Sequence, residues 1–240
     1  METLDTLHSG RVQILQPQSG YRFSLDPLLL CAFARIPARA RVADLGTGSG
    51  VIPLLLAKAG KGREFVGIEL QPELADRAVR SVALNGLAER IRIVRADVRE
   101  LPAELAAGSF AAVVCNPPYR KAGSGRVAPR AERGTARHEL AGGLSDFLRA
   151  AACLLDHGGC FTIVYLAERL PELLEALRAF RLEPKRLRTV HSRAGEPAKL
   201  VLVEGRKNAR PGLTVEAPLI VYREGKGRGY TAEMGKIFEA

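Results

Sequence analysis

A glycine-rich turn between an apolar strand and an apolar helix constrains the fold of this chain more than any other feature. The strand is predicted over residues 41–45, the turn reads Asp-Leu-Gly-Thr-Gly-Ser-Gly over 44–50, and the helix follows over 51–58. Glycine readily adopts the left-handed backbone that a tight strand-to-helix turn requires. This unit predicts the first step of an α/β fold built on a parallel sheet.

The alternation of strand and helix continues downstream. Further strands are predicted over residues 64–70, 90–96, 110–115 and 159–166, with helices over 72–84, 101–107, 144–155 and 170–180. Each strand–helix–strand unit implies a right-handed crossover, so these strands should lie parallel. Two strands over 184–192 and 198–204, joined by a short loop, are then predicted to form an antiparallel hairpin.

The length of 240 residues favours one main domain with small additions. We expect residues 1–40 to form an N-terminal extension and a helix packed on the core, with Asp26 as its N-cap and Pro27 at its first position. The main domain is predicted over 41–205. Residues 206–240 are predicted to be a basic tail with one possible extra strand at 219–222.

The chain carries 36 Lys and Arg against 26 Asp and Glu, a formal charge of +10. This balance favours a polyanionic partner such as nucleic acid, although an arginine-rich composition without such a partner is the alternative. Much of the charge falls in one glycine-containing loop. Its basic residues are Arg120, Lys121, Arg126, Arg130, Arg133 and Arg137. We expect this loop and the tail to contact phosphates, against the alternative of a solvated surface loop.

The four cysteines form no C-x-x-C pair, and three lie in apolar runs, so reduced core residues are expected. The sequence shows neither a basic leader followed by an apolar segment nor a run of about 18 apolar residues. Neither secretion nor membrane insertion is therefore predicted, and a cytoplasmic protein without an obligatory protein partner is the expectation.

Acidic residues stand at the carboxyl ends of three predicted strands: Asp44, Glu69 and Asp97. The carboxyl ends of parallel strands meet at one edge of a sheet, where α/β proteins bind ligands. The turn reads G-x-G-x-G rather than the dinucleotide pattern G-x-G-x-x-G, and Asp44 would repel a pyrophosphate. A ligand with an ammonium or sulfonium group suits this edge better. Solvated turn acids are the alternative.

The strand predicted over 110–115 runs into Asn-Pro-Pro-Tyr at 116–119. Two consecutive prolines cannot donate to a sheet ladder, so the strand must end near Asn116 and leave backbone carbonyls available. Asn-Pro also occurs simply as a strand-ending turn. The placement beside the glycine-rich turn favours a catalytic interpretation.

Together, the turn at 44–50, the two later acids and the sequence at 116–119 resemble class I S-adenosylmethionine-dependent methyltransferases that act on amino groups. The resemblance covers about residues 21–205. It implies a doubly wound, Rossmann-like α/β fold with a seven-stranded, mostly parallel sheet and a C-terminal antiparallel hairpin. S-adenosyl-L-methionine is the implied cofactor. The residues implied to bind it are Asp44, Gly46, Thr47, Gly48 and Gly50 around its methionyl part, Glu69 at the ribose, Asp97 at the adenine, and Asn116.

The resemblance also implies a chemical role for Asn116, Pro117 and Tyr119. An exocyclic amino group is a poor nucleophile because its lone pair is delocalised into the ring. If the Asn116 side-chain oxygen and the Pro117 carbonyl each accept one N–H, the lone pair is directed at the methyl group. Tyr119 would stack on the extruded base. This chemistry needs no metal.

Three further segments resemble the bacterial tRNA adenine-N6 methyltransferases that modify an adenine beside the anticodon. They are Phe23-Ser-Leu-Asp26, Ala136-Arg-His-Glu-Leu140 and Val190-His-Ser-Arg-Ala-Gly195. This resemblance implies RNA methylation at N6 of an adenine in the anticodon loop of a tRNA. The roles of His138 and His191 stay open.

Other functions remain as alternatives. A ribosomal guanine-N2 methyltransferase would use similar chemistry. A protein-glutamine N5-methyltransferase is a further alternative. That family carries a sizeable helical N-terminal domain, whereas only about 40 residues precede the first strand of the main domain here. A DNA adenine methyltransferase would need a target-recognition domain. A non-catalytic RNA-binding module is disfavoured by the presence of Asn116 and the three acids.

Overall fold

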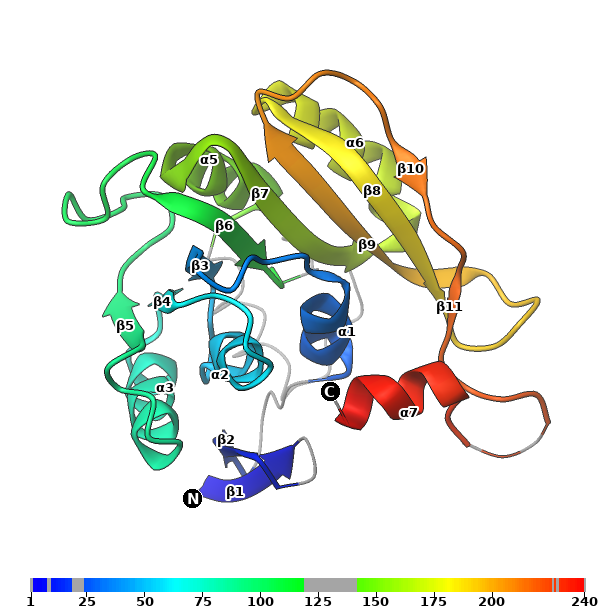
Figure 1. The fold of residues 1–240 in the computed structure, drawn as a ribbon, viewed down its shortest axis with the longest axis horizontal. Helices are drawn as coiled ribbons and strands as arrows, with labels where there is room; N and C mark the ends of the chain where they lie inside the picture. The colour runs from blue at the N-terminus through cyan, green and yellow to red at the C-terminus, as the bar shows by residue number, and fades with distance from the viewer. Residues whose placement is uncertain are drawn as a thin grey trace, which may run out of the picture.

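The computed structural model describes residues 2–7, 10–18, 24–118, 142–225, 227 and 229–239. These residues form one large sheet with helices on both faces and a separate two-stranded hairpin (Figure 1). The strands are β1 Glu2–Leu7, β2 Val12–Pro17, β3 Arg41–Leu45, β4 Glu64–Glu69, β5 Ile91–Arg95, β6 Phe110–Cys115, β7 Leu155–Leu166, β8 Leu182–His191, β9 Ala198–Lys207, β10 Thr214–Val215 and β11 Leu219–Ile220. The helices are α1 Asp26–Phe33, α2 Val51–Lys58, α3 Pro72–Leu84, α5 Leu144–Leu154, α6 Leu170–Ala179 and α7 Ala232–Glu239.

The strand order in the large sheet is β10–β8–β9–β7–β6–β3–β4–β5, and β11 also pairs with β8. Strands β3 to β7 pair parallel with one another, whereas β9 runs antiparallel to both β7 and β8. The predicted fold class, a mostly parallel sheet with a C-terminal antiparallel hairpin, is therefore confirmed. The described sheet has nine strands rather than the predicted seven, because the two short strands β10 and β11 both pair with β8.

The central strands are apolar because both faces of the sheet are covered. Val42 of β3 belongs to a core with α1, α2 and α3, whereas the adjacent Ala43 belongs to a second core with α5 and α6. Figure 1 shows these two helix layers on opposite sides of the sheet. The alternation of side chains along each strand thus joins three layers into one body.

The N-terminal residues contain regular structure that the sequence prediction missed. Strands β1 and β2 form an antiparallel hairpin whose Val12 and Ile14 are fully buried. The hairpin is held to α3 by side chains: Ser81 Oγ accepts from Leu15 N at 3.1 Å, and Asn85 bonds to both backbone groups of Gln13. The extension is therefore anchored to the core through hydrogen bonds from α3.

Two local predictions were wrong. The helix predicted over 101–107 is absent, and these residues form turns, since a segment of seven residues with an early proline is too short to nucleate a helix without packing. Helix α1 begins at Asp26 rather than being capped by it, and Ser24 Oγ accepts a hydrogen bond from Asp26 N at 3.3 Å.

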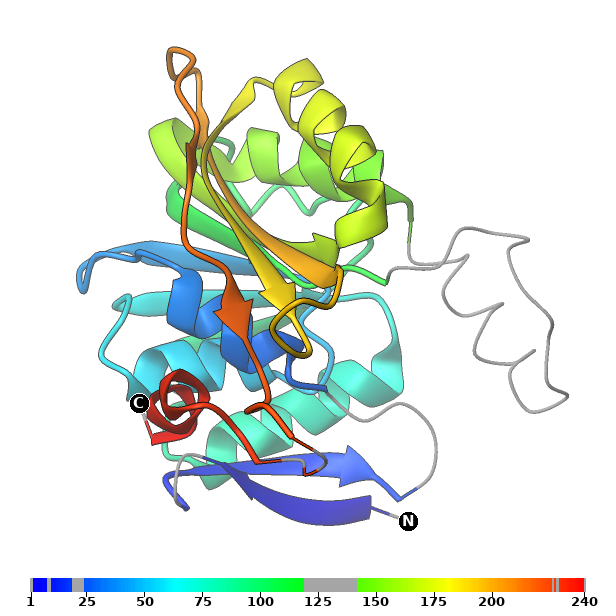
Figure 2. The ribbon, with the colours of Figure 1, turned by 90° about the vertical axis from the view of Figure 1, so that its right-hand side faces the viewer.

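The C-terminal segment is docked along its described length (Figure 2). The apolar run predicted as an extra strand includes β11, which pairs with the end of β8. Helix α7, which the sequence prediction missed, begins after Thr231, whose Oγ1 accepts from Met234 N at 3.3 Å. Met234 and Ile237 are buried in the same core as α1. The domain boundaries at 40 and 205 stay a prediction.

Three of the four cysteines are core residues, as the sequence predicted, but that prediction was wrong for Cys153, which lies on the exposed side of α5. Cys31, Cys115 and Cys160 are buried, Cys153 is exposed, and all four are free thiols. Within the described residues, no helix is both long enough and apolar enough to span a membrane.

Candidate active site

Four of the predicted polar residues lie at the carboxyl edge of adjacent strands. Asp44 of β3 is paired in register with Val114 of β6 and with Gly67 of β4. Asn116 directly follows β6, Glu69 ends β4, and Asp97 lies two residues beyond the end of β5. Because β6, β3, β4 and β5 are neighbours, these side chains form a row spaced by about 4.8 Å per strand.

The glycine-rich turn lies against this row. Gly46, Gly48 and Gly50 have φ angles of 71°, 59° and 82°, in the left-handed region that disfavours other residues. A side chain at Gly46 or Gly50 would also lie 3.2 Å from Phe147 or 3.3 Å from Ala78. A side chain at Gly48 would meet no described residue within 4 Å, so no described residue covers the middle of the turn.

Asp44 is the most unusual group of the site. Its side chain is buried, and neither carboxylate oxygen finds a hydrogen-bond donor among the described residues; the same holds for Thr47 Oγ1. Burial raises the pKa of Asp44 to about 7, with the nearby Thr47 hydroxyl opposing this rise and the charge of Glu69 adding to it. An unpartnered buried carboxylate destabilises the protein unless a cationic or donor-bearing group meets it.

Glu69 is also buried, but it has partners. Its Oε2 accepts from Gly48 N at 2.9 Å and its Oε1 accepts from Gln71 N at 2.8 Å. Burial raises the pKa of Glu69, and these backbone donors partly oppose the shift. Each oxygen retains acceptor capacity for a ligand hydroxyl, because a carboxylate offers about four lone-pair sites. Glu69 thus fixes the glycine-rich turn to the end of β4.

Asp97 makes a contact that the sequence prediction missed. Arg99 Nη2 lies 2.6 Å from Asp97 Oδ2, and the Arg99 backbone N–H donates to Oδ1 at 2.8 Å. These bonds hold the pKa of Asp97 below its ordinary value. The i, i+2 spacing of an acid and an arginine in a turn was the available sequence signal.

The strand-ending motif is described as far as Pro118. Asn116 is half-buried and Pro117 is buried, and Cys115 Sγ lies 3.5 Å from the Leu45 carbonyl oxygen, joining the ends of β6 and β3. Asn116 therefore stands one strand from Asp44. Tyr119 lies outside the described residues.

Several other predicted residues also lie outside the described residues: Phe23, His138 and the basic loop residues Arg120, Lys121, Arg126, Arg130, Arg133 and Arg137. His191 is described, at the end of β8. Its Nδ1 lies 2.7 Å from the Glu196 carbonyl oxygen and its Nε2 lies 2.9 Å from Thr189 Oγ1. Through these contacts His191 stabilises the β8–β9 hairpin.

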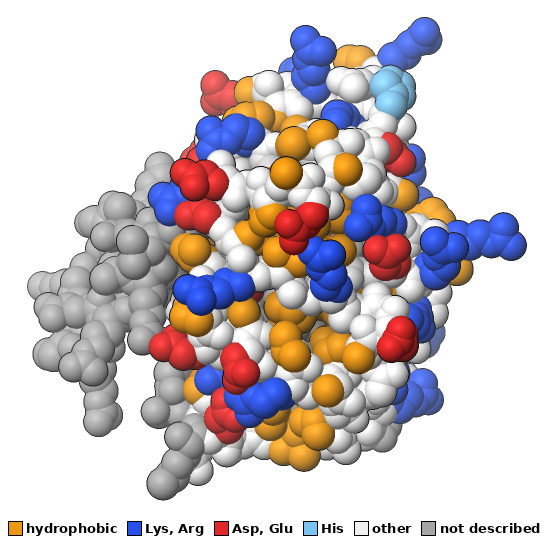
Figure 3. Space-filling model, turned by 90° about the vertical axis from the view of Figure 1, so that its left-hand side faces the viewer, with side chains coloured by type: hydrophobic (Ala, Val, Ile, Leu, Met, Phe, Trp, Pro, Cys, Tyr) orange, Lys and Arg blue, Asp and Glu red, His pale blue; other side chains and the backbone are white. Residues whose placement is uncertain are grey.

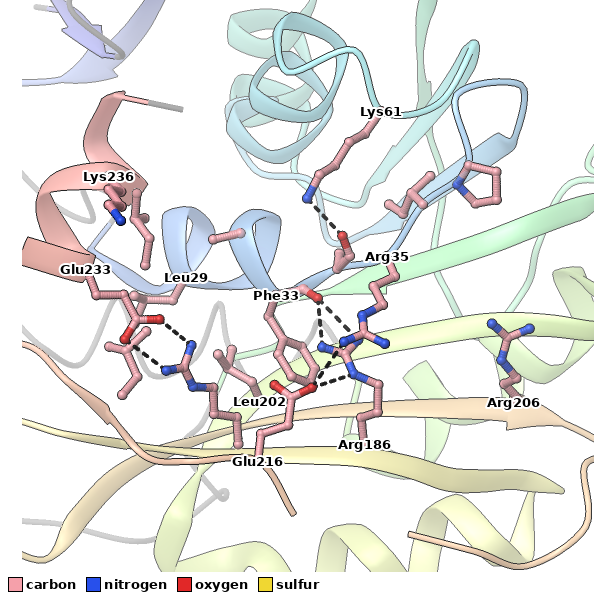
Figure 4. Close-up of a pocket in the computed structure, with 17 residues that line it drawn as sticks. Leu29, Phe33, Arg35, Lys61, Arg186, Leu202, Arg206, Glu216, Glu233 and Lys236 are labelled. Atoms are coloured by element: carbon pink, nitrogen blue, oxygen red, sulfur yellow. Dashed lines mark hydrogen bonds and ion pairs between the residues drawn. The ribbon is translucent and has the colours of Figure 1, made fainter. Parts of the chain in front are cut away.

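A larger cavity of about 850 Å³ lies away from this edge, between α1, α7, β8 and β9 (Figure 4). Its charged groups are largely paired: Arg186 with Glu204 at 2.6 Å and with Glu216 at 2.8 Å, and Arg188 with Glu233 at 2.7 Å. Lys61 Nζ donates to two carbonyl oxygens of α1 and its C-terminus. This network fastens the tail segment to α1 and the sheet.

Charge is mixed on the face of the molecule that Figure 3 shows, where Lys and Arg side chains are interspersed with Asp and Glu. No broad patch of one sign covers that face. The excess of positive charge in the sequence is therefore not concentrated there.

Known proteins resemble this chain in sequence and in fold. Residues 42–122 match a family described as a methyltransferase domain. Two relatives are each named tRNA1(Val) (adenine(37)-N6)-methyltransferase. The one from Porphyromonas gingivalis is 32% identical over 208 residues, which cover 84% of this chain and 81% of that protein. The one from Erwinia tasmaniensis is 34% identical over 163 residues, covering 68% of this chain and 65% of that protein.

Among solved structures, a predicted O-methyltransferase from Agrobacterium tumefaciens superimposes with a TM-score of 0.71 at 27% identity. The superposition covers 88% of this chain and 94% of that chain. The similarity in sequence and the similarity in fold thus point to the same class of enzyme.

Proposed function

This chain belongs to the family of bacterial tRNA (adenine-N6) methyltransferases, and on that premise we propose that it methylates N6 of an adenine in the anticodon loop of a tRNA. The chain is an S-adenosyl-L-methionine-dependent methyltransferase, as its sequence predicted. The observation that carries the proposal is the juxtaposition of Asn116-Pro117 with the unpartnered carboxylate of Asp44 on the neighbouring strand.

The residues of the carboxyl edge fit this cofactor. S-adenosyl-L-methionine supplies a methyl group on a positively charged sulfur and carries an ammonium group. Asp44 offers a buried negative charge that no described residue meets with a donor, and Glu69 offers acceptors for ribose hydroxyls. No described residue covers the middle of the turn at Gly48, so a ligand could approach it closely. Asp97 would meet the adenine amino group while keeping its bond to Arg99.

Asn116 and Pro117 then act on the acceptor. The strand ends at Cys115, so the Pro117 carbonyl lies beyond the ladder that β6 forms with β3 and β7, and the two prolines restrict the backbone that follows the Asn116 side chain. Two oxygens that each accept one amino hydrogen would orient the nitrogen and raise the electron density of its lone pair. Positioning of this kind is a large part of enzymatic rate enhancement. Tyr119 is proposed to stack on the base.

The basic loop over residues 120–137 and the tail are proposed to contact tRNA phosphates, which suits the formal charge of +10. A tRNA substrate would place the enzyme in the cytoplasm. An O-methyltransferase activity is less suited to this site, because a hydroxyl group has one hydrogen whereas the Asn116-Pro117 pair offers two acceptors.

The test is incubation of the purified chain with total tRNA and labelled S-adenosyl-L-methionine, followed by nucleoside analysis. We expect N6-methyladenosine in the anticodon loop of one tRNA, and no product with the Asn116→Ala variant. Label in N2-methylguanosine, in a 2′-O-methylated nucleoside or in protein glutamine would contradict the proposal.

A further inference from the structure

A small recess lies at the same edge of the sheet as Asn116, on the face covered by α1. Its volume is about 150 Å³, and it is bounded by the first turn of α1, the β8–β9 hairpin and the residues after β11. The two substrate-facing segments that resemble tRNA methyltransferases, at 23–26 and 190–195, contribute Asp26, Val190 and Ser192 to it. The tail contributes Val221 and Tyr222.

The register places the recess close to the reaction site. Val190 pairs with Leu200 on β9, Leu200 pairs with Leu166 on β7, and Ile163 of β7 pairs with Cys115 of β6. The recess therefore lies between two strands (Leu200 on β9) and three strands (Val190 on β8) across the sheet from Asn116, or about 10–14 Å. A nucleotide adjacent to a base extruded at Asn116 would lie over this part of the edge.

The chemistry of the walls suits a nucleobase. Its lining combines apolar residues, among them Leu29, Leu200 and Val221, with residues that carry polar groups, which are Asp26, Ser192, Lys199 and Tyr222. The volume is below the range of about 300–1,000 Å³ typical of pockets for whole small-molecule ligands. A single heteroaromatic ring system fits better, since loop bases in RNA are recognised unstacked, by apolar contact and edge hydrogen bonds.

Lys199 adds a charge that the protein does not neutralise. Its side chain is exposed at the rim and makes neither an ion pair nor a hydrogen bond with any described residue. Most charged groups around the larger cavity are paired, whereas Lys199 remains available to a phosphate of the same nucleotide.

The tail wall of the recess is held rigidly. Tyr222 N donates to Ser192 O at 2.9 Å, and the Tyr222 ring stacks on Tyr230 with centroids 5.4 Å apart. Arg193 lies over the Tyr222 ring at 5.7 Å and donates to the carbonyl oxygens of Arg223 and Gly227, both at 2.6 Å. These contacts make the hairpin and the tail one preformed surface.

We infer that this recess binds the base of a nucleotide adjacent to the target adenine, with Lys199 on its phosphate. This inference rests on the proposed function and identifies the site that would read the RNA next to the methylated base. It also assigns the C-terminal segment a role in substrate selection, since Val221 and Tyr222 complete the pocket.

The test uses the full-length chain with anticodon stem-loop RNAs in which one base flanking the target adenine is replaced by an abasic site. For the wild-type chain, loss of the bound base should lower kcat/KM about tenfold, because one base contact contributes on the order of 1–3 kcal/mol. Ser192→Trp, which fills the recess, should have a reduced kcat/KM on intact RNA and lose nothing more on the abasic RNA.

Lys199→Ala should reduce the slope of log affinity against log salt by about 0.7, the value for one single-strand phosphate contact. The matched control is Lys58→Ala, an exposed lysine in the last turn of α2 and outside the basic loop and the tail, which should leave the slope unchanged. Calorimetry should give an unchanged dissociation constant for S-adenosyl-L-methionine in all three variants, which excludes a loss of folding.

Equal losses on abasic RNA for the wild type and Ser192→Trp, or an unchanged slope for Lys199→Ala, would overturn the inference while leaving N6-adenine methylation in place. Absence of methylation of any tRNA by the wild-type chain would overturn the proposed function and this site with it.

Discussion

Two buried carboxylates in this molecule are treated in opposite ways. Glu204 of β9 lies 2.6 Å from Arg186, a residue that lines the larger cavity and whose guanidinium also lies 4.2 Å from the Phe33 ring. Asp44, equally buried at the carboxyl edge, has no donor among the described residues. The charge of Glu204 is paired within the protein, whereas the charge of Asp44 is left for a ligand to pair.

The difference distinguishes charged side chains that stabilise the fold from charged side chains that are placed to bind a ligand. Glu204 pairs with Arg186 of β8, and Arg186 also contacts Phe33 of α1 and Glu216 of the tail segment, so this network joins parts of the chain that are distant in sequence. Among the residues that the structure describes, Asp44 has no hydrogen-bond partner although it is buried on a central strand of the sheet. A buried charge that destabilises the ligand-free protein is favoured only where binding compensates for it.

The largest effect is expected on the free energy of unfolding when the ion pair between Glu204 and Arg186 is broken. Glu204→Ala leaves Arg186 partly buried with only Glu216 as an ionic partner, and loss of one member of a buried pair destabilises by about 3–5 kcal/mol. Chemical denaturation should show this decrease in the free energy of unfolding. Glu196→Ala, which removes an exposed carboxylate on the β8–β9 hairpin, should change it by less than about 0.5 kcal/mol. Equal stability of the two variants would remove the contrast between the two regions.

The next effect concerns turnover at the carboxyl edge. Asn116→Ala should lower kcat by on the order of 100- to 1000-fold, the usual cost of removing one preorganised hydrogen-bonding group from a transition state. Calorimetry should show nearly unchanged affinity for S-adenosyl-L-methionine. Asn116→Asp keeps acceptor oxygens and should lose less activity than the alanine variant. Retained turnover in Asn116→Ala would remove Asn116 from the reaction.

Much of this edge could be predicted from the sequence because its determinants are local. A glycine turn, a strand-end acid and an Asn-Pro-Pro sequence each define a backbone geometry within a few residues, and parallel pairing brings the strand ends together. The strands were accordingly placed within a few residues of their observed bounds. The roles of Asp44, Glu69, Asp97 and Asn116 remain predictions.

Helix α7 and the β1–β2 hairpin could not be predicted, because they depend on contacts between segments that are distant in sequence. Helix α7 has eight residues and depends on the burial of Met234 and Ile237 against α1. The β1–β2 hairpin similarly depends on Ser81 and Asn85 of α3. Isolated elements of this length are marginal, so their sequences carry little signal until the partner surface is known.

A smaller effect should follow from neutralising the unsatisfied charge. Asp44→Asn should weaken S-adenosyl-L-methionine binding about tenfold or more in calorimetry, since hydrogen bonds to charged groups contribute about 1.5–3 kcal/mol. Without cofactor, the free energy of unfolding should stay equal or increase at pH 8, because an unpaired buried charge has been removed. Asp76→Asn on the surface of α3 is the control and should leave cofactor affinity unchanged. A large loss of stability in Asp44→Asn would assign Asp44 to the structural class with Glu204.

The smallest effect per measurement should be the pH dependence that Asp44 gives to stability and to cofactor affinity. Burial raises the pKa of Asp44 to about 7 in the folded chain, whereas an unfolded aspartate has a pKa near 4. Between about pH 4 and 7 the folded state therefore binds a proton that the unfolded state does not, so Asp44 makes the cofactor-free protein lose stability as pH rises through this window.

Binding of a cationic ligand favours the ionised carboxylate, so affinity for S-adenosyl-L-methionine should instead increase with pH, by up to about tenfold per unit below pH 7. Calorimetry from pH 5.5 to 8 should show this increase in the wild type and a flatter profile in Asp44→Asn, which retains Glu69, whose pKa burial also raises. Parallel profiles in the two proteins would mean that the cofactor does not meet the Asp44 carboxylate.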